Sequence, residues 1–213
     1  VINITPDSFY KKSQKKDYNS VKIVFEKMET CGASIIDIGG ESTRPFSDPV
    51  SLKEEISRVI PVIEGICKES DVCISIDTTK SKVAFEALEA GASLINDISA
   101  MEIDSLMVDV ALKFNCPIVL MHMKGIPENM QKHIKYNNIV KEVYNFFKDK
   151  IQDLNSKGFF DIVIDPGFGF GKSIENNFEL LKNLEKLNDL NCPILVGTSR
   201  KSMIQKTLNV SVQ

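Results

Sequence analysis

Short runs of apolar residues alternate with longer amphipathic stretches along this chain of 213 residues. The apolar runs have the length of strands, and the stretches between them have the spacing of apolar positions that is typical of helices. The predicted strands cover residues 1–4, 34–38, 72–76, 93–95, 117–121, 161–164 and 193–196. The predicted helices cover residues 21–31, 52–69, 81–90, 105–114, 138–157 and 174–188, and a seventh covers Ser202–Leu208.

Repeated alternation of strand and helix requires parallel pairing through right-handed crossovers. Both a (β/α)8 barrel and a doubly wound sheet meet this requirement. Two internal similarities favour the barrel: residues 32–38 are similar to 91–98, and 115–118 are similar to 191–194. Each similarity repeats a helix-to-strand junction, as equivalent units of a ring would. We therefore expect an α/β fold, a (β/α)8 TIM barrel forming one domain over residues 1–213.

The length of the chain bounds this barrel. Its 43% hydrophobic content is enough for a sizeable core, but a complete barrel typically needs about 250 residues. The chain opens inside an apparent strand and ends soon after the helix that begins at Ser202. We expect a fragment truncated at both ends, with about seven strands and without the last βα unit. We expect this fragment to be inactive alone.

Composition excludes several classes of function. No apolar run approaches membrane-spanning length, and nothing resembles a signal peptide. A net charge of −3, with Lys and Glu interspersed, argues against a nucleic-acid surface. Five cysteines without C-x-x-C spacing fit a reducing compartment. His122 and His133 are the only histidines, which excludes a His-based metal cluster, and we expect both to be structural.

A glycine-rich segment, residues 164–172, follows the sixth predicted strand and begins with the carboxylate of Asp165. It superficially resembles a phosphate-binding P-loop, but the spacing from Gly167 to Gly171 is one residue short, and Pro166 stands where the first glycine belongs. A nucleotide site is therefore disfavoured. The segment is better explained as a loop that presents Asp165 and lets a flat ligand approach closely.

Polar residues occur at or just past the ends of several predicted strands, where a barrel places its active site. One such residue is usually a structural hydrogen-bond partner, but two carboxylates, two carboxamides and a cationic pair on different strands indicate a binding site. The residues are Asn3, Asp77, Asn96, His122, Asp165 and the segment Ser199-Arg200-Lys201.

The chemistry of these side chains suggests the ligand. Asp77, Asp165 and Asn96 suit a planar heterocycle rich in amide and amine groups, because a carboxylate accepts two parallel N–H bonds. Asn3, Thr43 and Arg44 offer groups suited to an anion. Residues 199–202 open a helix at a position where barrels often bind phosphate.

At these positions the chain resembles dihydropteroate synthase. The matching blocks run in the family's order over nearly the whole chain: residues 3–9, 37–45, 75–78, 95–98, 121–123, 165–172 and 199–202. The resemblance implies a (β/α)8 fold and a folate-pathway transferase that is a target of sulfonamides. It also implies the reaction, in which 6-hydroxymethyl-7,8-dihydropterin diphosphate and 4-aminobenzoate give 7,8-dihydropteroate and pyrophosphate with the help of Mg²⁺.

The resemblance also implies roles for individual residues. The pterin would be held by Asp77, Asn96, Asp165 and Lys201, of which Asp77, Asp165 and Lys201 would be catalytic. Thr43 and Arg44 would bind the diphosphate, and Asn3 the metal. Pro45, Phe170, Ser199 and Lys201 would border 4-aminobenzoate.

One block departs from the family pattern. The family usually continues Ser-Asp-Gly-Gly after Thr-Pro-Asp-Ser-Phe, whereas this chain has Tyr10-Lys11-Lys12-Ser13 and so lacks an acidic residue there. Two alternatives stay open. A related pterin-binding methyltransferase would share the Asp-Asn-Asp set but would not require residues 41–45 or 199–202. A pterin-binding remnant with impaired catalysis would account for the altered first loop.

The resemblance extends to partners and location. It implies small-molecule substrates, with neither nucleic acid nor membrane as a partner. It is compatible with a homodimer and with fusion to other folate-pathway domains. The expected location is the cytoplasm, or the mitochondrion in a eukaryote.

Overall fold

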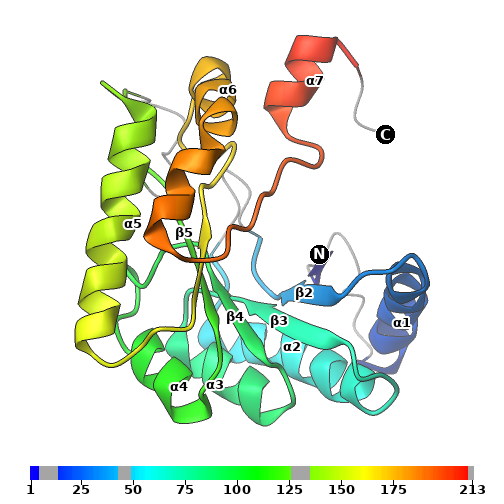
Figure 1. The fold of residues 1–213 in the computed structure, drawn as a ribbon. Helices are drawn as coiled ribbons and strands as arrows, with labels where there is room; N and C mark the ends of the chain where they lie inside the picture. The colour runs from blue at the N-terminus through cyan, green and yellow to red at the C-terminus, as the bar shows by residue number, and fades with distance from the viewer. Residues whose placement is uncertain (5–13, 43–48, 126–134, 211–213) are drawn as a thin grey trace. The chain divides into compact units, whose positions relative to one another are not determined.

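The computed structural model describes residues 1–4, 14–42, 49–125 and 135–210. Six strands belong to one sheet in the order β1-β2-β3-β4-β5-β6 (Figure 1). The strands are β1 (Ile2–Asn3), β2 (Ile35–Gly39), β3 (Cys73–Asp77), β4 (Leu94–Asp97), β5 (Ile118–Met121) and β6 (Ile162–Asp165). The helices are α1 (Gln14–Thr30), α2 (Leu52–Cys67), α3 (Ser81–Glu89), α4 (Met107–Phe114), α5 (Ile139–Ser156), α6 (Ile174–Lys182) and α7 (Ser202–Leu208), with a 3₁₀ helix η1 (Leu184–Leu190).

The chain divides into two compact units. Unit 1 comprises residues 1–43, 47–97 and 101–118, and unit 2 comprises residues 44–46, 98–100 and 119–213. Strands β1 to β4 and helices α1 to α4 belong to the first, and helices α5 to α7 with β6 to the second.

The predicted alternation of strand and helix is confirmed, with two differences. The predicted helix at residues 174–188 is α6 followed by the 3₁₀ helix η1. The predicted strand at residues 193–196 is reduced to one parallel bridge, between Ile164 and Ile194. Leu195 donates to the carbonyl of Ile164 at 2.9 Å, and then its side chain and that of Val196 are exposed. The described residues give this run only β6 as a neighbour, so the ladder stops after one pair.

In unit 1 the strands β1 to β4 pair in parallel, and side-chain alternation divides the sheet into two faces. The helices α2, α3 and α4 lie along one face (Figure 1). Ile36, Ile38, Ile74 and Ile76 are buried, as are apolar residues of α2 such as Ile63. The alternate positions carry polar side chains, which leaves the other face available for chemistry.

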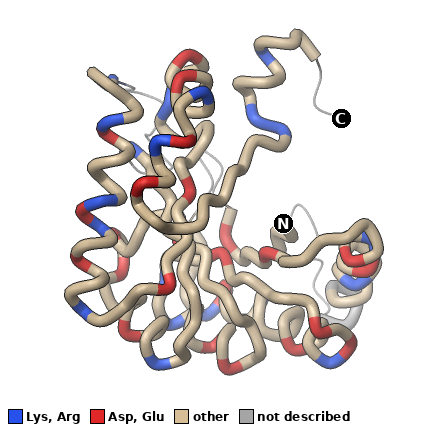
Figure 2. Tube along the Cα trace, viewed as in Figure 1, with Lys and Arg blue, Asp and Glu red and all other residues tan. Residues whose placement is uncertain are grey.

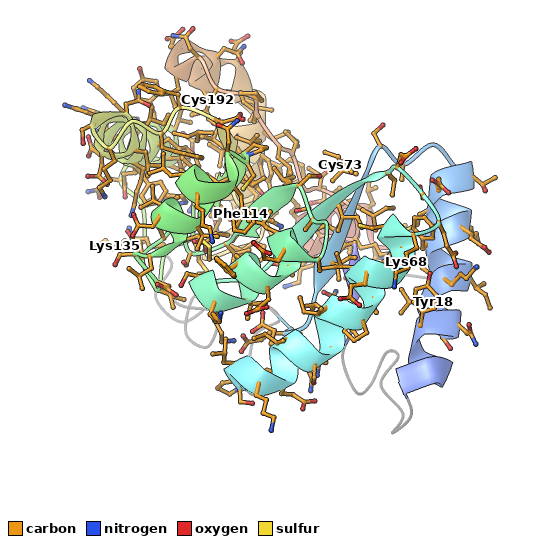
Figure 3. All side chains as sticks on the ribbon, turned by 90° about the horizontal axis from the view of Figure 1, so that it is seen from below. Tyr18, Lys68, Cys73, Phe114, Lys135 and Cys192 are labelled. Carbon is orange, nitrogen blue, oxygen red and sulfur yellow. The ribbon has the colours of Figure 1, made fainter. Side chains whose placement is uncertain are left out.

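Helix α1 packs on α2 at a glycine. A Cβ added at Gly65 would overlap the ring of Tyr18, whose side chain projects from α1 and is labelled in Figure 3. Even an alanine at position 65 would therefore require the Tyr18 ring or the helices to move. The close approach places α1 directly against α2.

In unit 2, helix α5 packs against α6 and η1, and α6 packs against α7. The buried side chains include Phe147 and Leu154 of α5, Leu180 of α6 and Leu187 of η1. Helices α5 and α6 both begin with a side-chain cap. Asn138 accepts the backbone N–H of Lys141 at 2.9 Å in α5, and Ser173 caps α6 in the same way.

One of the two internal similarities has a clear conformational basis. Helix α4 ends at Asn115 with φ of 48°, and η1 ends at Asn191 with φ of 56°. Asparagine is one of the few residues that adopt this left-handed conformation readily. Each is followed by Cys-Pro-Ile, which starts β5 in one case and the Ile164–Ile194 bridge in the other. The repeated motif is therefore a repeated helix stop before a strand.

Acidic and basic side chains are interspersed along the outer helices rather than gathered by sign (Figure 2). Within the described part of the chain, none of the helices combines the length and apolarity needed to cross a membrane. All five cysteines are free; Cys73 and Cys192, labelled in Figure 3, are half-buried, and Cys116 is buried.

A buried glutamate connects the segments that follow β2 and β3 in unit 1. Glu55 of α2 is fully buried, and its Oε1 accepts the hydroxyl of Thr78 at 2.7 Å. Its Oε2 accepts Lys80 Nζ at 2.5 Å, and the same ammonium reaches Glu41 Oε2 at 2.5 Å. Glu41 Oε1 in turn accepts the backbone N–H of Val50 at 2.9 Å. The network therefore ties residues 41, 50, 78 and 80 to one helix.

Replacing Lys80 with Met would leave Glu55 buried without its cation. Removing one partner of a buried pair is costly, and because Lys80 is 27% exposed we expect a loss of about 2–4 kcal/mol in the free energy of unfolding. Lys82→Met is the matched control, since Lys82 forms an exposed pair with Glu86 on the same helix. Equal urea midpoints for the two variants would contradict the structural role of Lys80.

Candidate active site

In unit 1, parallel registration gathers the predicted site residues at the ends of β1 to β4. Asp77 is the last residue of β3 and pairs with Gly39 on one side and Asn96 on the other. A Cβ at Gly39 would lie 3.2 Å from Asn3 Oδ1 and 3.3 Å from Asp77 Oδ2. The absence of a side chain at Gly39 therefore lets the carboxamide and the carboxylate approach each other. The structure brings Asn3, Asp77 and Asn96 together, as predicted.

Asp37 joins this cluster, although the sequence did not single it out. Asn96 Nδ2 donates to Asp37 Oδ2 at 3.2 Å, while Asp37 Oδ1 and Ser75 Oγ are buried with no hydrogen-bond partner among the described residues. Strand alternation could have identified Asp37 from the sequence, because it puts Asp37 on the same face as Ser75 and Asp77 once the strand register is known. Asp37 Oδ1 is a buried acceptor, and a ligand with an N–H group would supply it with a donor.

The electrostatics of the unit 1 cluster are strongly acidic. Burial raises the pKa of Asp77 well above its usual range, and the nearby carboxylates of Asp37, Glu55, Asp97 and Glu41 raise it further. Burial also raises the pKa of Asp37, against the opposing effect of Ser75 and Asn96. A ligand that donates hydrogen bonds or carries positive charge would relieve this repulsion.

In unit 2, Asp165 is the last residue of β6 and opens the glycine-rich loop. Its Oδ1 accepts the backbone N–H of Gly167 at 2.8 Å. Farther along, Lys201 Nζ lies 4.4 Å from the centre of the Phe170 ring, and a Cβ at Gly169 would be 3.2 Å from Lys201 Cδ. The loop thus carries Asp165 at one end and packs against Lys201 at the other, so the structure gathers three predicted site residues here.

Charge in this second cluster is better balanced. Burial raises the pKa of Asp165, whereas the Gly167 N–H and the cations of Lys201 and Lys172 lower it. Burial lowers the pKa of Lys201, and Asp165 opposes that shift. Lys172 is a residue that sequence reasoning left without a role; it is buried, and no single-residue signal separates it from a surface lysine.

His122 follows β5 and is buried among the rings of Phe146, Phe147 and Tyr136. Burial and the neighbouring Lys172 lower the pKa of His122 to about 3, so the ring is neutral. The aromatic packing fits the predicted structural role. Its Nδ1 has no hydrogen-bond partner among the described residues, so the structure shows aromatic packing of the ring but no hydrogen bond at this atom.

The remaining predicted residues divide into two groups. Ser199 and Arg200 are exposed just before α7, and Arg200 has a left-handed backbone with φ of 55°. Thr43, Arg44 and Pro45 lie outside the described residues. So do His133 and the departure from the family pattern at residues 10–13.

The possible metal ligands suit a hard cation held by few protein groups. Among the described residues, no group of three or more His, Cys, Asp or Glu side chains is placed to hold a metal. The predicted ligand Asn3 offers one carboxamide oxygen, beside Asp77 across Gly39. Mg²⁺ prefers oxygen ligands and is commonly bound by one or two protein groups together with substrate phosphates and water. The carboxamide oxygen of Asn3 is therefore of the ligand type that the predicted Mg²⁺ requires.

Comparison with known proteins identifies the class. A model of the pterin binding enzyme family matches residues 1–213, and the chain belongs to this family. The dihydropteroate synthase of Clostridium beijerinckii is 46% identical over 216 residues, which cover 100% of this chain and 77% of that protein. The resemblance found in the sequence is therefore confirmed.

Solved structures agree with this assignment. The Yersinia pestis dihydropteroate synthase in a sulfonamide drug complex has a TM-score of 0.90 and 41% identity, covering 98% of this chain and 76% of its own. The Xanthomonas albilineans enzyme with 4-aminobenzoic acid has a TM-score of 0.90 and 37% identity, covering 99% and 76%. The predicted (β/α)8 class is confirmed by this shared fold, of which the described residues form six strands.

The raised pKa of Asp77 makes stability depend on pH. Below the ordinary carboxyl pKa of 3.8 the group is protonated in both the folded and unfolded states; above it, ionisation costs the folded state more. Stability is therefore lost as pH rises through the folded-state pKa. We expect Asp77→Asn to raise the melting temperature at pH 7, and the gain to shrink as pH approaches 3.8. Asp71→Asn, at an exposed position before β3, is the control; a gain independent of pH would contradict this account.

Proposed function

We propose that this protein is a dihydropteroate synthase. It joins 6-hydroxymethyl-7,8-dihydropterin diphosphate to 4-aminobenzoate and releases pyrophosphate. The observation that carries the proposal is the match over the whole chain to enzymes of that name, together with an Asp-Asn-Asp-Lys set at the expected positions. The family match over residues 1–213 supports treating both units as one pterin-binding domain.

Recognition of the pterin is assigned to four residues. Asp77 and Asp165 accept hydrogen bonds from the amine and amide edge of the ring, and Asn96 offers both a donor and an acceptor. Lys201 donates from its ammonium group, whose Nζ lies 4.4 Å from the centre of the Phe170 ring. The orphaned oxygen of Asp37 and the raised pKa of Asp77 support an N–H-rich ligand, because such a ligand supplies the donors that the protein lacks.

The chemistry proposed is a substitution at the pterin methylene. The C–O bond to the diphosphate breaks, the diphosphate leaves with the electron pair, and the amine nitrogen of 4-aminobenzoate forms the new C–N bond and then loses a proton. Positive charge develops on the pterin as the bond breaks, and the carboxylates Asp77 and Asp165 stabilise it. An aniline nitrogen is already neutral near pH 7, so no strong base is required.

The remaining roles follow the family pattern. Thr43 and Arg44 bind the diphosphate, and Pro45, Phe170, Ser199 and Lys201 border 4-aminobenzoate. Asn3 holds Mg²⁺, and a bound Mg²⁺ supplies electrostatic stabilisation of a phosphorylated leaving group. A homodimer, fusion to other folate-pathway domains, and a cytoplasmic or mitochondrial location stay predictions.

The first test is product formation by the full-length protein. We expect 7,8-dihydropteroate and pyrophosphate from the two substrates. Asp77→Asn and Asp165→Asn replace an acceptor oxygen with a donor, and losing such a hydrogen bond costs about 1.5–3 kcal/mol, so pterin affinity should fall about tenfold or more. Asp161→Asn, exposed just before β6, is the control. Folded variants with unchanged affinity would refute the assignment, and a folded wild type without pyrophosphate release would favour the methyltransferase or the remnant.

The 4-aminobenzoate site makes a second prediction. The drug complex of the Yersinia pestis enzyme suggests that sulfonamides compete at this site, since they copy the aniline ring and extend beyond it. We expect Pro45→Ser to weaken sulfonamide inhibition more than it raises KM for 4-aminobenzoate. Equal changes in the two constants would show that Pro45 lies elsewhere.

A further inference from the structure

Lys172, at the end of the glycine-rich loop, is a lysine with only 4% of its surface exposed. Its Nζ donates to the carbonyl oxygens of His122 at 3.0 Å, Gly167 at 2.9 Å and Phe170 at 3.1 Å. An ammonium group has three N–H donors, so backbone oxygens use all of them. None of the three acceptors is a carboxylate, which distinguishes Lys172 from an ordinary ion pair.

The reason for this arrangement is the packing of backbone directly on backbone. Gly167 has φ of +69°, and a Cβ there would overlap the carbonyl oxygen of His122. Gly171 has φ of +62°, and a Cβ there would lie 2.6 Å from the carbonyl oxygen of Lys124. The loop therefore lies against the segment after β5 with no side chains between them. Carbonyl oxygens brought together in this way need a donor, since unsatisfied buried acceptors are costly.

The residues that Lys172 holds are the ones that contact the proposed ligand-binding groups. Gly167 gives its carbonyl to Lys172 and its N–H to Asp165 Oδ1 at 2.8 Å. Phe170 gives its carbonyl to Lys172, and its ring lies 4.4 Å from Lys201 Nζ. One ammonium group thus fixes both ends of the loop that presents Asp165 and Phe170.

Asn177 of α6 provides a second and independent anchor. Its Oδ1 accepts the N–H of Gly169 at 2.8 Å, and its Nδ2 donates to the carbonyls of Lys172 at 3.2 Å and Ser173 at 2.7 Å. The loop therefore keeps part of its support when the Lys172 ammonium is removed. We therefore expect a variant that lacks only this charge to fold, which makes the role of Lys172 testable.

The titratable groups around Asp165 are few. Lys172 and Lys201 both lower the pKa of Asp165 against the effect of burial, and the neighbouring His122 is neutral. The pKa of Lys172 is lowered to about 7. Burial is the main cause, Lys201 lowers the pKa further, and Asp165 opposes the shift. The three carbonyl contacts favour the charged form of Lys172, because a neutral amine has one donor fewer.

We infer that Lys172 is a positioning residue of the pterin site, whose buried ammonium group sets the shape of the glycine-rich loop and helps to keep Asp165 ionised. The inference rests on the proposed function, because it assumes that Asp165 binds the pterin. The hydrogen bonds of the Lys172 ammonium all go to backbone carbonyls, so it acts through Asp165 and Phe170.

The test is the pH dependence of 6-hydroxymethylpterin binding to the full-length protein carrying Lys172→Met. Affinity should fall about tenfold, since the loop loses three charged hydrogen bonds. The acid limb of the binding curve should move to higher pH, because Asp165 loses a neighbouring cation. Lys172→Arg keeps the charge and should keep the acid limb. In an Asp165→Asn background, Lys172→Met should leave the remaining limb unmoved.

Lys182→Met, exposed in the last turn of α6, is the matched control and should behave as wild type. Wild-type protein that binds no pterin would refute the proposed function itself. If the wild type binds the pterin and Lys172→Met has the same affinity and the same acid limb, only this inference is overturned.

A measurement on unaltered protein covers the case in which Lys172→Met does not fold. The ammonium resonance of Lys172, followed by NMR in protein labelled with ¹⁵N-lysine, should be present at pH 6, below the Lys172 pKa of about 7, and should shift when 6-hydroxymethylpterin is added. A resonance that exchanges freely with water, or that ignores the ligand, would overturn the inference.

Discussion

Carboxylates that are withdrawn from water destabilise a fold unless donors or cations surround them. Unit 1 shows two answers to this constraint. Glu55 is fully buried, and both of its oxygens are satisfied by Thr78 and Lys80. Asp77 is nearly as buried but stands among other carboxylates, and its pKa is raised. The first is a structural solution, and the second leaves the charge for a ligand to stabilise.

This contrast links stability to function. The buried charge of Glu55 is balanced by Lys80 and Thr78, and through these contacts Glu55 holds the segments after β2 and β3 in place. The protein leaves Asp37 Oδ1 without a hydrogen-bond partner among the described residues, at a position where a ligand could donate. A pterin carries the amine and amide N–H groups that this position lacks. The same residues that favour ligand binding therefore lower the free energy of unfolding.

In unit 2 the buried acceptors that need donors are backbone carbonyl oxygens rather than side-chain carboxylates. The loop after β6 approaches the segment after β5 so closely that glycine is required at two positions, and the carbonyl oxygens of both segments converge. A buried ammonium group from Lys172 satisfies them. The conformation of a loop that carries ligand-binding groups thus depends on one internal cation, which Asn177 supplements from α6.

The sequence by itself determined the alternation of strands and helices, the placement of Asp77 and Asp165 at strand ends, and the family, because these depend on local periodicity and on motifs contiguous in the chain. The run at residues 193–196 reads as a strand locally, but a strand needs partners, and the described residues give it one bridge. Only the tertiary structure decided the roles of Asp37, Lys172 and Glu55. Each is defined by neighbours distant in sequence, namely Asn96, the carbonyl of His122, and Lys80. Register and packing between elements create those contacts, and no local pattern encodes them.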